Sequence, residues 1–295
     1  MGIDRNPLVY VNGAFMPQDK AVISVYDSAF LAGDSIFEGV RVYNGKVFKL
    51  NEHIDLLFEC AHALMMKLTF TKEDVRNAVL ETLRKNDLHD GVHVRIQITR
   101  GKMSKPYMDP ALALDQPSLV IFTNPRRPDY PREGVRILIS SIRRPPPDCL
   151  DQKIHTTNKT NSLLAKLEAN MAGVAEALML DTDGFVAECS ATNIFFVKDK
   201  KVLTSTLKSC KMGITRQLII EGARELGYEV SEKDISLYEV FNADECFLCG
   251  THGELAPVVE IAGRKIGEGK PGPVTQALSN WYNEQARRDG VPIYP

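Results

Sequence analysis

Three lysines lie close together in the stretch DCLDQKIHTTNKTNSLLAKLEANMAGVAEALMLD, which covers residues 148–181: Lys153, Lys159 and Lys166. A lysine amine is a nucleophile toward carbonyl groups when its surroundings keep it neutral. The stretch predicts the tip of a strand followed by a helix over NSLLAKLEANMAG. The chemistry of the protein therefore depends on which of these amines, if any, meets a carbonyl compound.

Two further segments have the pattern of an anion site. In GITRQLII, a glycine followed by small and polar residues predicts a helix start, where backbone N–H groups lack partners within the helix. Thr215 would add a hydroxyl there, although an ordinary helix N-terminus has the same pattern. In CFLCGTHGELAPV, the residues Gly250, Thr251 and Gly253 interrupt a buried strand. They expose amides and a hydroxyl, which predicts a second contact to a phosphate or carboxylate.

Two charged residues lie in strands that are otherwise largely apolar. Glu188 lies in DGFVAECSATNIFFV, where a carboxylate is costly unless it meets a cation or a hydrogen-bond donor. A structural salt bridge and a protonated pyridine nitrogen both satisfy that need. Arg95 lies in the alternating strand VHVRIQITRG, and its guanidinium is suited to a substrate carboxylate, with a partly buried ion pair as the alternative.

The elements that must position these residues fall into two parts. Asn-Gly turns predict the hairpins LVYVNGAFM and GVRVYNGKVFKL, which two helices and further strands complete into a small α/β domain over residues 1–124. The proline-rich stretch 125–134 predicts an interdomain linker. Residues 135–295 form the larger predicted domain, in which strands alternate with the helices NSLLAKLEANMAG and GITRQLIIEGARELG.

The composition excludes several classes of protein. With 295 residues, 44% of them hydrophobic and 25% charged, the chain has the make-up of an ordinary globular protein. A formal net charge of −2 argues against a nucleic-acid partner, and the first residues form no apolar run for a signal peptide or membrane span. Six dispersed cysteines predict a cytoplasmic location, and the two of CFLC are expected in the core, with no metal site.

Taken in order, these segments resemble one family. From VYVNG and FEGVRVYNG through LLAKLEA, LDTDGFVAECSATNIFFV, GITR and GTHGELAPV to GEGKPGPVT, the chain is similar to class IV pyridoxal-phosphate aminotransferases. This group contains branched-chain and D-amino-acid aminotransferases and aminodeoxychorismate lyase. The resemblance implies the two-domain α/β fold called fold type IV, with a small α/β N-terminal domain and a larger pseudo-barrel C-terminal domain. It also implies a homodimer.

The resemblance further implies roles for individual positions. Glu188 would pair with the pyridine nitrogen of pyridoxal 5'-phosphate, which keeps the ring an electron sink. The phosphate would lie against the amides of Ile214 and Thr215 and the Thr251 hydroxyl. The other cofactor positions of the motifs are Asn193, Gly213 and Gly250. The substrate positions are Arg95 for the carboxylate, Phe37 for the pocket wall, and His252 as a backbone donor.

The chain departs from the family where the Schiff-base lysine belongs. Counting back from the LLAK helix with Asn158 as the shared asparagine places His155 there, and one extra residue would place Ile154 there. Lys159 follows Asn158, where branched-chain relatives carry a tyrosine that reaches the cofactor, and its flexible stem could swing to the aldehyde carbon. We therefore predict that Lys159 is the catalytic lysine and that His155 assists proton transfer. The alternative is a solvated Lys159 in an inactive protein.

Other departures concern the phosphate and the pocket wall. Leu56 stands where relatives have an arginine that contacts the phosphate, and loss of that contact costs about 1.5–3 kcal/mol. Arg216 and a basic residue from elsewhere in the chain are the candidate replacements. Ala32 stands where relatives have a tyrosine, which leaves substrate choice open. Lys153 and Lys166 have basic counterparts in relatives, so we expect a structural role for the first and surface exposure for the second.

The predicted function is transfer of the amino group of a branched-chain or other small apolar amino acid to 2-oxoglutarate. Arg95, and the lack of an Arg-x-His motif after TRGKMSKPYMDP, favour branched-chain substrates over D-amino acids. One alternative is a lyase of the aminodeoxychorismate type, which eliminates pyruvate. Another is a catalytically silent protein that binds a phosphorylated ligand. The sequence leaves open the amino donor, the keto acid and the pathway.

Overall fold

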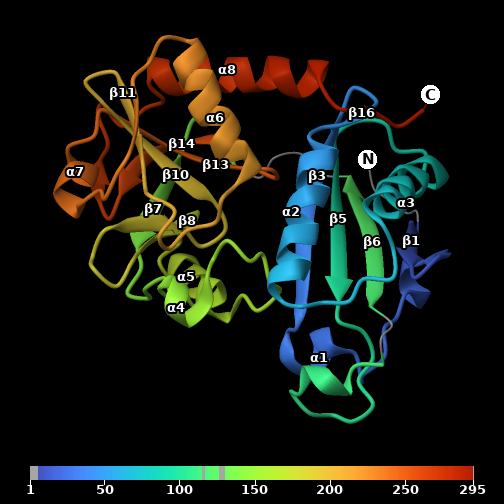
Figure 1. Cartoon of the computed structure of the whole chain (residues 1–295). Helices are drawn as coiled ribbons and strands as arrows, with labels where there is room; N and C mark the ends of the chain where they lie inside the picture. The colour runs from blue at the N-terminus through green and yellow to red at the C-terminus, as the bar shows by residue number, and fades with distance from the viewer. Residues whose placement is uncertain (1–5, 115–116, 126–129, 295) are drawn as a thin grey trace. The chain divides into compact units, whose positions relative to one another are not determined.

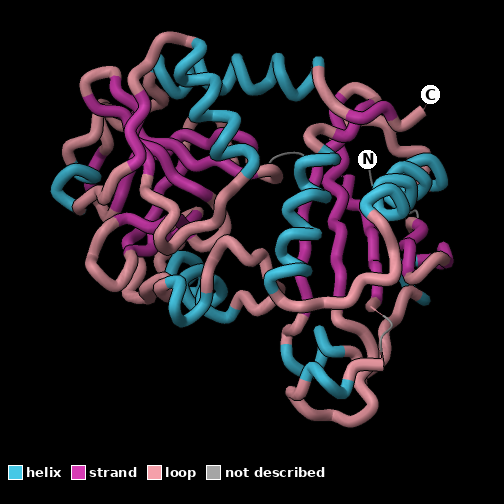
Figure 2. Tube along the Cα trace, in the orientation of Figure 1, coloured by secondary structure: helices cyan, strands magenta, loops and turns pink. Residues whose placement is uncertain are grey.

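The computed structural model describes residues 6–114, 117–125 and 130–294, and the chain divides into two compact units (Figure 1). Unit 1 comprises Met1–Arg127, Ile154–Asn158 and Ala286–Pro295, and unit 2 comprises Pro128–Lys153 and Lys159–Gln285. Residues 126–129 of the predicted linker lie outside the described residues. Both units combine helices with a sheet, as Figure 2 shows, so the predicted α/β class holds for each.

Unit 1 is built on a seven-stranded antiparallel sheet in the order β16-β4-β3-β5-β6-β1-β2. Its strands are β1 (Leu8–Val11), β2 (Ala14–Pro17), β3 (Ser35–Tyr43), β4 (Lys46–Val47), β5 (Val92–Thr99), β6 (Ser118–Pro125) and β16 (Val291–Pro292). Its helices are α1 (Ser28–Ala32), α2 (Leu50–Ala63) and α3 (Lys72–Lys85), with the 3-10 turns η1 (Gln18–Lys20) and η2 (Pro110–Leu112). Both predicted hairpins are present.

The core of unit 1 lies between its sheet and the helices α2 and α3, and Figure 1 shows α2 lying along the strands. Alternate residues of a strand point to opposite faces. Ile36 and Val40 of β3 and Ile96 of β5 are fully buried, and they form one cluster with Leu57 of α2 and Val79 of α3. The intervening residues of β3 and β5 therefore point to the face that these helices do not cover.

Residues 154–158 run beside the start of β3, although they are far from it in the sequence. The backbone N–H of Phe37 donates to the carbonyl of His155 at 3.0 Å, and that of Thr157 donates to the carbonyl of Ser35 at 2.9 Å. Ile154 packs against the core of unit 1. These contacts fix the backbone of His155 against β3.

The predicted strand tip ahead of the Lys159 helix is wrong. Residues Pro147–Leu150 form a short helix, α4, because three consecutive prolines remove strand donors and suit a helix N-terminus. Only an isolated bridge between Thr156 and Ile36 has strand geometry in this region.

Unit 2 is built on a nine-stranded mixed sheet in the order β12-β11-β10-β13-β14-β7-β8-β9, with β15 beside β14. Its strands are β7 (Val135–Ile139), β8 (Glu176–Leu180), β9 (Val186–Cys189), β10 (Asn193–Lys198), β11 (Lys201–Thr204), β12 (Val230–Glu232), β13 (Glu245–Gly250), β14 (Glu254–Ile261) and β15 (Arg264–Lys265). Its helices are α4, α5 (Thr160–Met171), α6 (Ile214–Glu225), α7 (Leu237–Phe241) and most of α8 (Pro273–Arg288). The predicted helices at α5 and α6 are confirmed.

The two cysteines of CFLC are core residues, as predicted. Cys246 and Cys249 both lie in β13 and are almost fully buried. Burial raises the pKa of the Cys249 thiol to about 12 and the pKa of Cys246 well above its usual value. Both side chains therefore stay protonated and unreactive.

Among the described residues, no helix combines the length and the apolar character that crossing a membrane requires.

Candidate active site

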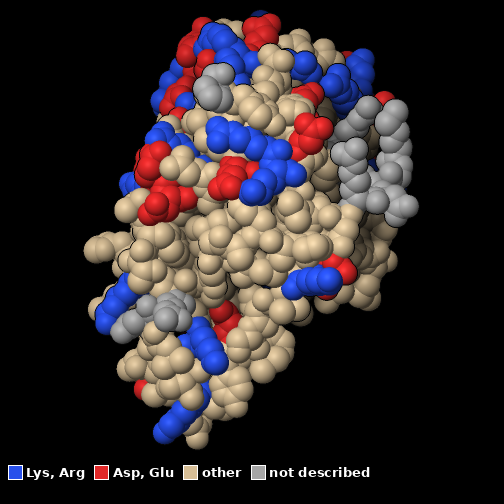
Figure 3. Space-filling view, turned by 90° about the vertical axis from the view of Figure 1, so that its right-hand side faces the viewer, with Lys and Arg blue, Asp and Glu red and all other residues tan. Residues whose placement is uncertain are grey.

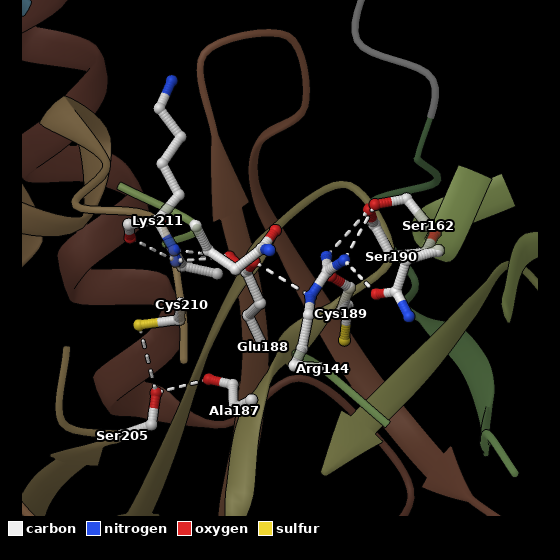
Figure 4. A network of polar contacts seen from close by, with 12 residues as sticks. Arg144, Ser162, Ala187, Glu188, Cys189, Ser190, Ser205, Cys210 and Lys211 are labelled. Carbon is white, nitrogen blue, oxygen red and sulfur yellow. Dashed lines mark hydrogen bonds and ion pairs between the residues drawn. The ribbon is translucent and has the colours of Figure 1, made fainter. Parts of the chain in front are cut away.

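The centre of the candidate site in unit 2 is the carboxylate of Glu188, which lies in β9 and is 6% exposed (Figure 4). Its Oε2 accepts hydrogen bonds from the side-chain amide of Asn193 and from the backbone N–H of Lys211, both at 3.2 Å. Its Oε1 lies 3.1 Å from Nε of Arg144, in an ion pair. That Nε has no well-aligned hydrogen-bond partner among the described residues, so Oε1 keeps room for one more donor.

Arg144 is the residue that sequence reasoning missed. Its guanidinium is 3% exposed and donates to the Ser162 hydroxyl at 2.8 Å, the Asn161 side chain at 3.1 Å and the Cys189 carbonyl at 2.8 Å. It thereby joins the start of α5 to the end of β9 and compensates the buried charge of Glu188. The only signal in the sequence is a charged residue next to the PPP run, which does not reveal its partner.

Asn193 ties the chain segment before α6 to Glu188. Its amide nitrogen donates both to Glu188 and to the carbonyl of Lys211, the second at 3.1 Å. A Cβ atom on Gly213 would collide with the side-chain oxygen of Asn193. Gly213 is therefore required for close approach of this segment to β10, rather than for an unusual backbone angle.

The N-terminus of α6 is open to an anion. The helix follows Gly213, which provides no side-chain cap. The N-terminus of α8 differs, since the carboxylate of Glu245 accepts hydrogen bonds from the backbone N–H groups of Val274 at 3.0 Å and Thr275 at 2.8 Å. Among the residues that the structure describes, no carboxylate accepts from the first amides of α6, at Ile214 and Thr215, and these amides carry the partial positive charge of a helix start.

Gly250 ends β13, and Thr251 and His252 lie in the loop between β13 and β14. Beside it lies Thr192, whose buried hydroxyl has no hydrogen-bond partner among the described residues. A Cβ atom on Gly250 would lie 3.8 Å from the Thr192 methyl carbon, so the two residues are in close proximity. The loop therefore adds hydroxyl groups and amides to the same unit that holds Glu188 and α6.

Arg216, the candidate replacement for the missing phosphate-binding arginine, has another role. It is 2% exposed, donates to the Ser205 carbonyl at 2.7 Å, and pairs with Glu232 at 2.6 Å. Its terminal nitrogen holds α6 against β12 and the segment after β11. The Arg216 guanidinium thus makes its hydrogen bond and ion pair within unit 2.

Unit 1 holds a buried carboxylate between two histidines. Glu38, on the helix-covered face of β3, is 1% exposed. One of its oxygens lies 2.7 Å from Nδ1 of His53 in α2, and the other lies 2.9 Å from Nδ1 of His155. A carboxylate only accepts, so each Nδ1 carries the hydrogen. In the neutral ring, Nε2 of His155 is then the basic atom.

The other face of β3 and β5 carries the predicted substrate residues. The Arg95 guanidinium lies 3.6 Å from the centre of the Phe37 ring, and that ring lies 3.9 Å from the His155 ring. Nε of Arg95 donates to Gln97 at 3.3 Å, and its terminal nitrogens make no hydrogen bond to the described residues. Burial lowers the pKa of Arg95, and the charge of Glu38 opposes that effect. The guanidinium therefore has donors left for a carboxylate.

The lysines of the opening stretch have different surroundings. Lys153 is exposed and pairs with Asp151 at 3.1 Å, and Lys166 donates to the Ala175 carbonyl. Lys159 is half-buried and precedes the first residue of α5, where its carbonyl accepts the Leu163 N–H at 2.8 Å. The structure thus gives Lys153 and Lys166 partners of their own.

Comparison with known proteins places the chain in a family. Residues 35–261 match the model of the amino-transferase class IV family, and the chain belongs to that family. A putative branched-chain-amino-acid aminotransferase of Methanocaldococcus jannaschii is 39% identical over 97% of this chain and 99% of its own length. Branched-chain-amino-acid aminotransferase-like protein 2 of Arabidopsis thaliana is 44% identical over 97% of this chain. The chain spans about half of that plant protein, which it covers to 51%.

Solved structures confirm the predicted fold type. The branched-chain amino acid aminotransferase of Thermobaculum terrenum, solved in its PLP-form, matches with a TM-score of 0.87 at 30% identity, over 96% of this chain and 95% of that one. The Escherichia coli enzyme of the same name matches with a TM-score of 0.89 at 29% identity, over 99% of this chain and 98% of that one. The sheet of unit 2 is the curled half-barrel of these proteins.

Proposed function

We propose that the protein is a pyridoxal-phosphate-dependent aminotransferase that moves the amino group of a branched-chain or other small apolar amino acid to 2-oxoglutarate. Family membership supports the reaction class. The observation that carries the proposal is the state of Glu188: a buried carboxylate whose Oε1 has an ion-pair partner but no aligned hydrogen bond. Such an atom suits the N–H of a protonated pyridine.

The residues of unit 2 fit the cofactor. Glu188 would accept from the ring nitrogen, and Asn193 would hold that carboxylate in place. The uncapped amides of Ile214 and Thr215, with the Thr251 hydroxyl, would bind the phosphate. Gly213 allows the segment before α6 to approach Asn193 closely, and a Cβ atom on Gly250 would lie 3.8 Å from the Thr192 methyl carbon. When bound, the cofactor would supply a positively charged ring that withdraws electrons from the substrate's α-carbon.

The residues of unit 1 fit an amino-acid substrate. Arg95 would bind the substrate carboxylate through its terminal nitrogens, and its cation–π contact with the Phe37 ring would help to position the guanidinium. His155 would move a proton at Nε2, because Glu38 holds its Nδ1 hydrogen. His252 stays a predicted contact of the carboxylate. Lys159 stays the amine that the sequence predicts.

We also propose a cytoplasmic homodimer. Unit 1 exposes large apolar side chains at Val22, Phe30 and Met108, which are 75%, 68% and 84% exposed, and exposed apolar groups of this size mark contact surfaces. Figure 3 shows one face where acidic and basic side chains gather toward one end and a broad area carries neither. Six free cysteines suit a reducing compartment. Analytical ultracentrifugation of the purified chain would measure the assembly.

The proposal is tested by product analysis of the cofactor-loaded protein. With L-leucine and 2-oxoglutarate, we expect glutamate to form at a rate proportional to protein concentration. Pyruvate formed from aminodeoxychorismate would instead establish the lyase alternative. Binding of pyridoxal phosphate without either product would establish the silent alternative. A protein that fails to bind the cofactor at all, measured by equilibrium dialysis, would refute the assignment of Glu188 and α6.

A further inference from the structure

We infer that Glu176, at the start of β8, is a positioning residue that keeps Oε1 of Glu188 open to the N–H of a protonated pyridine. This inference rests on the proposed function and adds a residue that acts on Glu188 through two others, Ser190 and Arg144. All four residues belong to unit 2, so their contacts lie within one compact body.

Glu176 is a second buried carboxylate in the unit that holds Glu188. It is 1% exposed, and its hydrogen-bond donors among the described residues are two hydroxyls and a backbone amide. Oε1 accepts from the Ser190 hydroxyl and from the Ala177 N–H at 2.8 Å, and Oε2 accepts from the Tyr130 hydroxyl at 3.4 Å. Burying a carboxylate is costly unless donors satisfy it, so these contacts hold Glu176 and its neighbours in place.

Ser190 connects Glu176 to the guanidinium of Arg144. The Ser190 hydroxyl donates to Glu176, and its backbone N–H donates to the Ala177 carbonyl at 3.1 Å. The Ser190 carbonyl accepts from Nη2 of Arg144 at 3.1 Å, and the Cys189 carbonyl accepts from the same nitrogen at 2.8 Å. Two hydrogen bonds to β8 therefore fix Ser190, and two carbonyls fix Nη2.

The direction of the Arg144 guanidinium decides which of its nitrogens meets Glu188. Nη1 donates to Asn161 at 3.1 Å and to Ser162 at 2.8 Å, while Nη2 donates to the two backbone carbonyls. Nε is the nitrogen beside Oε1 of Glu188, at 3.1 Å and without an aligned hydrogen bond. Figure 4 shows the guanidinium between Glu188 on one side and Ser162 and Ser190 on the other. The terminal nitrogens are thus turned away from the carboxylate.

A second buried arginine of unit 2 shows the alternative arrangement. The Ser205 carbonyl accepts from Nη2 of Arg216 at 2.7 Å, but the Ser205 hydroxyl donates to the Ala187 carbonyl and not to a carboxylate. Here the same Nη2 also donates to the carboxylate of Glu232 at 2.6 Å. An arginine that is held differently from Arg144 therefore does place a terminal nitrogen on its carboxylate partner.

Loss of the hydrogen bond between Glu176 and Ser190 would release one side of the Arg144 site. Arginine–carboxylate pairs are frequently bidentate, with two parallel N–H···O bonds. A terminal nitrogen of Arg144 would then turn to Glu188 beside Nε and occupy the acceptor proposed for the pyridine N–H. Glu176 thus acts on the contact to the ring nitrogen, and not on the anion site at the start of α6.

The test compares pyridoxal phosphate with its analogue in which a C–H group replaces the ring nitrogen. Equilibrium dialysis of the purified full-length chain measures both dissociation constants. A charge-assisted hydrogen bond to Glu188 should make the unmodified protein bind pyridoxal phosphate roughly tenfold to hundredfold more tightly than the analogue. Glu176→Met and Ser190→Ala should each lose most of this preference, while the dissociation constant of the analogue stays unchanged. A purely structural role would weaken both ligands equally.

Two further variants separate positioning from charge and from general destabilisation. Glu176→Gln keeps an oxygen for the Ser190 hydroxyl, and its amide can donate to the Tyr130 hydroxyl, so the preference should be retained. Ser205→Ala is the matched control, because it also removes a buried hydroxyl from a serine whose carbonyl accepts from an arginine, away from Arg144. It should keep the preference. Circular dichroism shows whether each variant is folded, and Ser190→Ala decides if Glu176→Met is not.

The remaining outcomes overturn different statements. An unchanged preference in Ser190→Ala, or equal weakening of both ligands, would overturn the inference and leave the proposed aminotransferase intact. Loss of the preference in Glu176→Gln would overturn it too, because the charge of Glu176 and not its hydrogen bond would then act. Equal binding of the two ligands by the unmodified protein would refute the assignment of Glu188 to the ring nitrogen. Failure of the unmodified protein to bind either ligand would refute the proposed function itself.

Discussion

At the scale of single residues, the site depends on a carboxylate buried beside a guanidinium. The Glu188 and Arg144 side chains are 7% and 3% exposed, so neither charge is well solvated. Removing one member of such a pair leaves the other charge buried without compensation. Stability and cofactor binding are therefore coupled at this pair, and substitutions there must be assayed for both.

We expect Glu188→Gln to lower the free energy of unfolding of the cofactor-free protein by about 3–5 kcal/mol, because Arg144 would keep a buried, uncompensated charge. The measurement is urea unfolding followed by circular dichroism. Glu232→Gln is the matched control, since Glu232 also pairs with a buried arginine but is 39% exposed. A loss at Glu232 as large as that at Glu188 would contradict the role of burial.

Gly213 and Gly250 give a matched pair of substitutions. A methyl group on Gly213 would collide with the Asn193 side chain, whereas one on Gly250 would meet the Thr192 methyl at an ordinary contact distance of 3.8 Å. We expect Gly213→Ala to cost about 1–3 kcal/mol and to weaken pyridoxal-phosphate binding, through displacement of Asn193. Gly250→Ala should have a small effect. Equal dissociation constants from equilibrium dialysis would contradict the requirement for glycine at position 213.

Arg95 is expected to act on the substrate and not on the cofactor. Loss of one charge-assisted contact to a carboxylate costs about 1.5–3 kcal/mol, which is roughly a tenfold to hundredfold rise in KM for the amino acid. Arg95→Met should show this rise while the affinity for pyridoxal phosphate stays unchanged. Arg136→Met, at an exposed position of β7, is the control. Weaker cofactor binding in Arg95→Met would contradict the assignment.

The sequence alone was enough to select some residues of the candidate site but not others. Glu188 and Thr215 could be chosen from the sequence, because a carboxylate in an apolar strand and a glycine before a helix have local signatures. Arg144 and Lys211 could not, because each reaches Glu188 from a segment with no regular periodicity. Their roles come from contacts distant in sequence, which no local pattern encodes.

At the scale of elements, local sequence patterns predicted the structures formed by residues that are close together in the chain. The Asn-Gly turns produced both hairpins of unit 1, since Asn44 and Gly45, like Asn12 and Gly13, adopt positive φ angles that these residues tolerate. The sequence did not reveal α8, which begins at Pro273 and takes its cap from Glu245 in another strand. Nor did it reveal that residues 154–158 contact β3, which lies far away in the sequence.

Helix α3 has a cap whose strength depends on pH. Thr71 and Asp74 form a capping box, and the backbone and side-chain hydrogen bonds from Thr71 hold the pKa of Asp74 below its usual 3.8. A lowered pKa means that the charged carboxylate stabilises the folded state above the ordinary value and that this contribution disappears as the pH falls through the lowered one. We expect Thr71→Ala to cost about 1 kcal/mol near neutral pH.

The loss of unfolding free energy caused by Thr71→Ala should shrink as the pH falls below 3.8, the ordinary pKa of Asp74. Urea unfolding of the original protein and of Thr71→Ala across that range measures it. The Ser236–Glu239 capping box of α7 is left unchanged in both proteins and serves as an internal reference. A penalty that stays constant down to the lowest pH would show that Asp74 does not contribute.

At the scale of the whole molecule, the sheet orders lay beyond sequence reasoning. In unit 2, β7 lies between β14 and β8 and is parallel to both, although β14 comes more than 100 residues later in the sequence than β7 (Val135–Ile139 against Glu254–Ile261). Alternating hydrophobic residues predict that a strand exists but not which strand lies beside it. The family resemblance supplied the architecture that local pattern could not, and the solved relatives confirm it.

Cofactor binding should protect a defined subset of this architecture. The groups proposed to hold pyridoxal phosphate lie in β9, the start of α6 and the loop after β13, all in unit 2. A ligand at a hundredfold excess over its dissociation constant stabilises the folded state by about 2.7 kcal/mol. We therefore expect amide hydrogen exchange to slow in residues 186–193, 211–218 and 250–254 when the cofactor is added, with α3 unchanged as the control.

Inorganic phosphate at the same concentration should protect the α6 and loop peptides but not β9, because phosphate lacks the ring N–H from which Glu188 would accept a hydrogen bond. Protection of β9 by phosphate alone would contradict the assignment of Glu188 to the ring, since the carboxylate repels an anion.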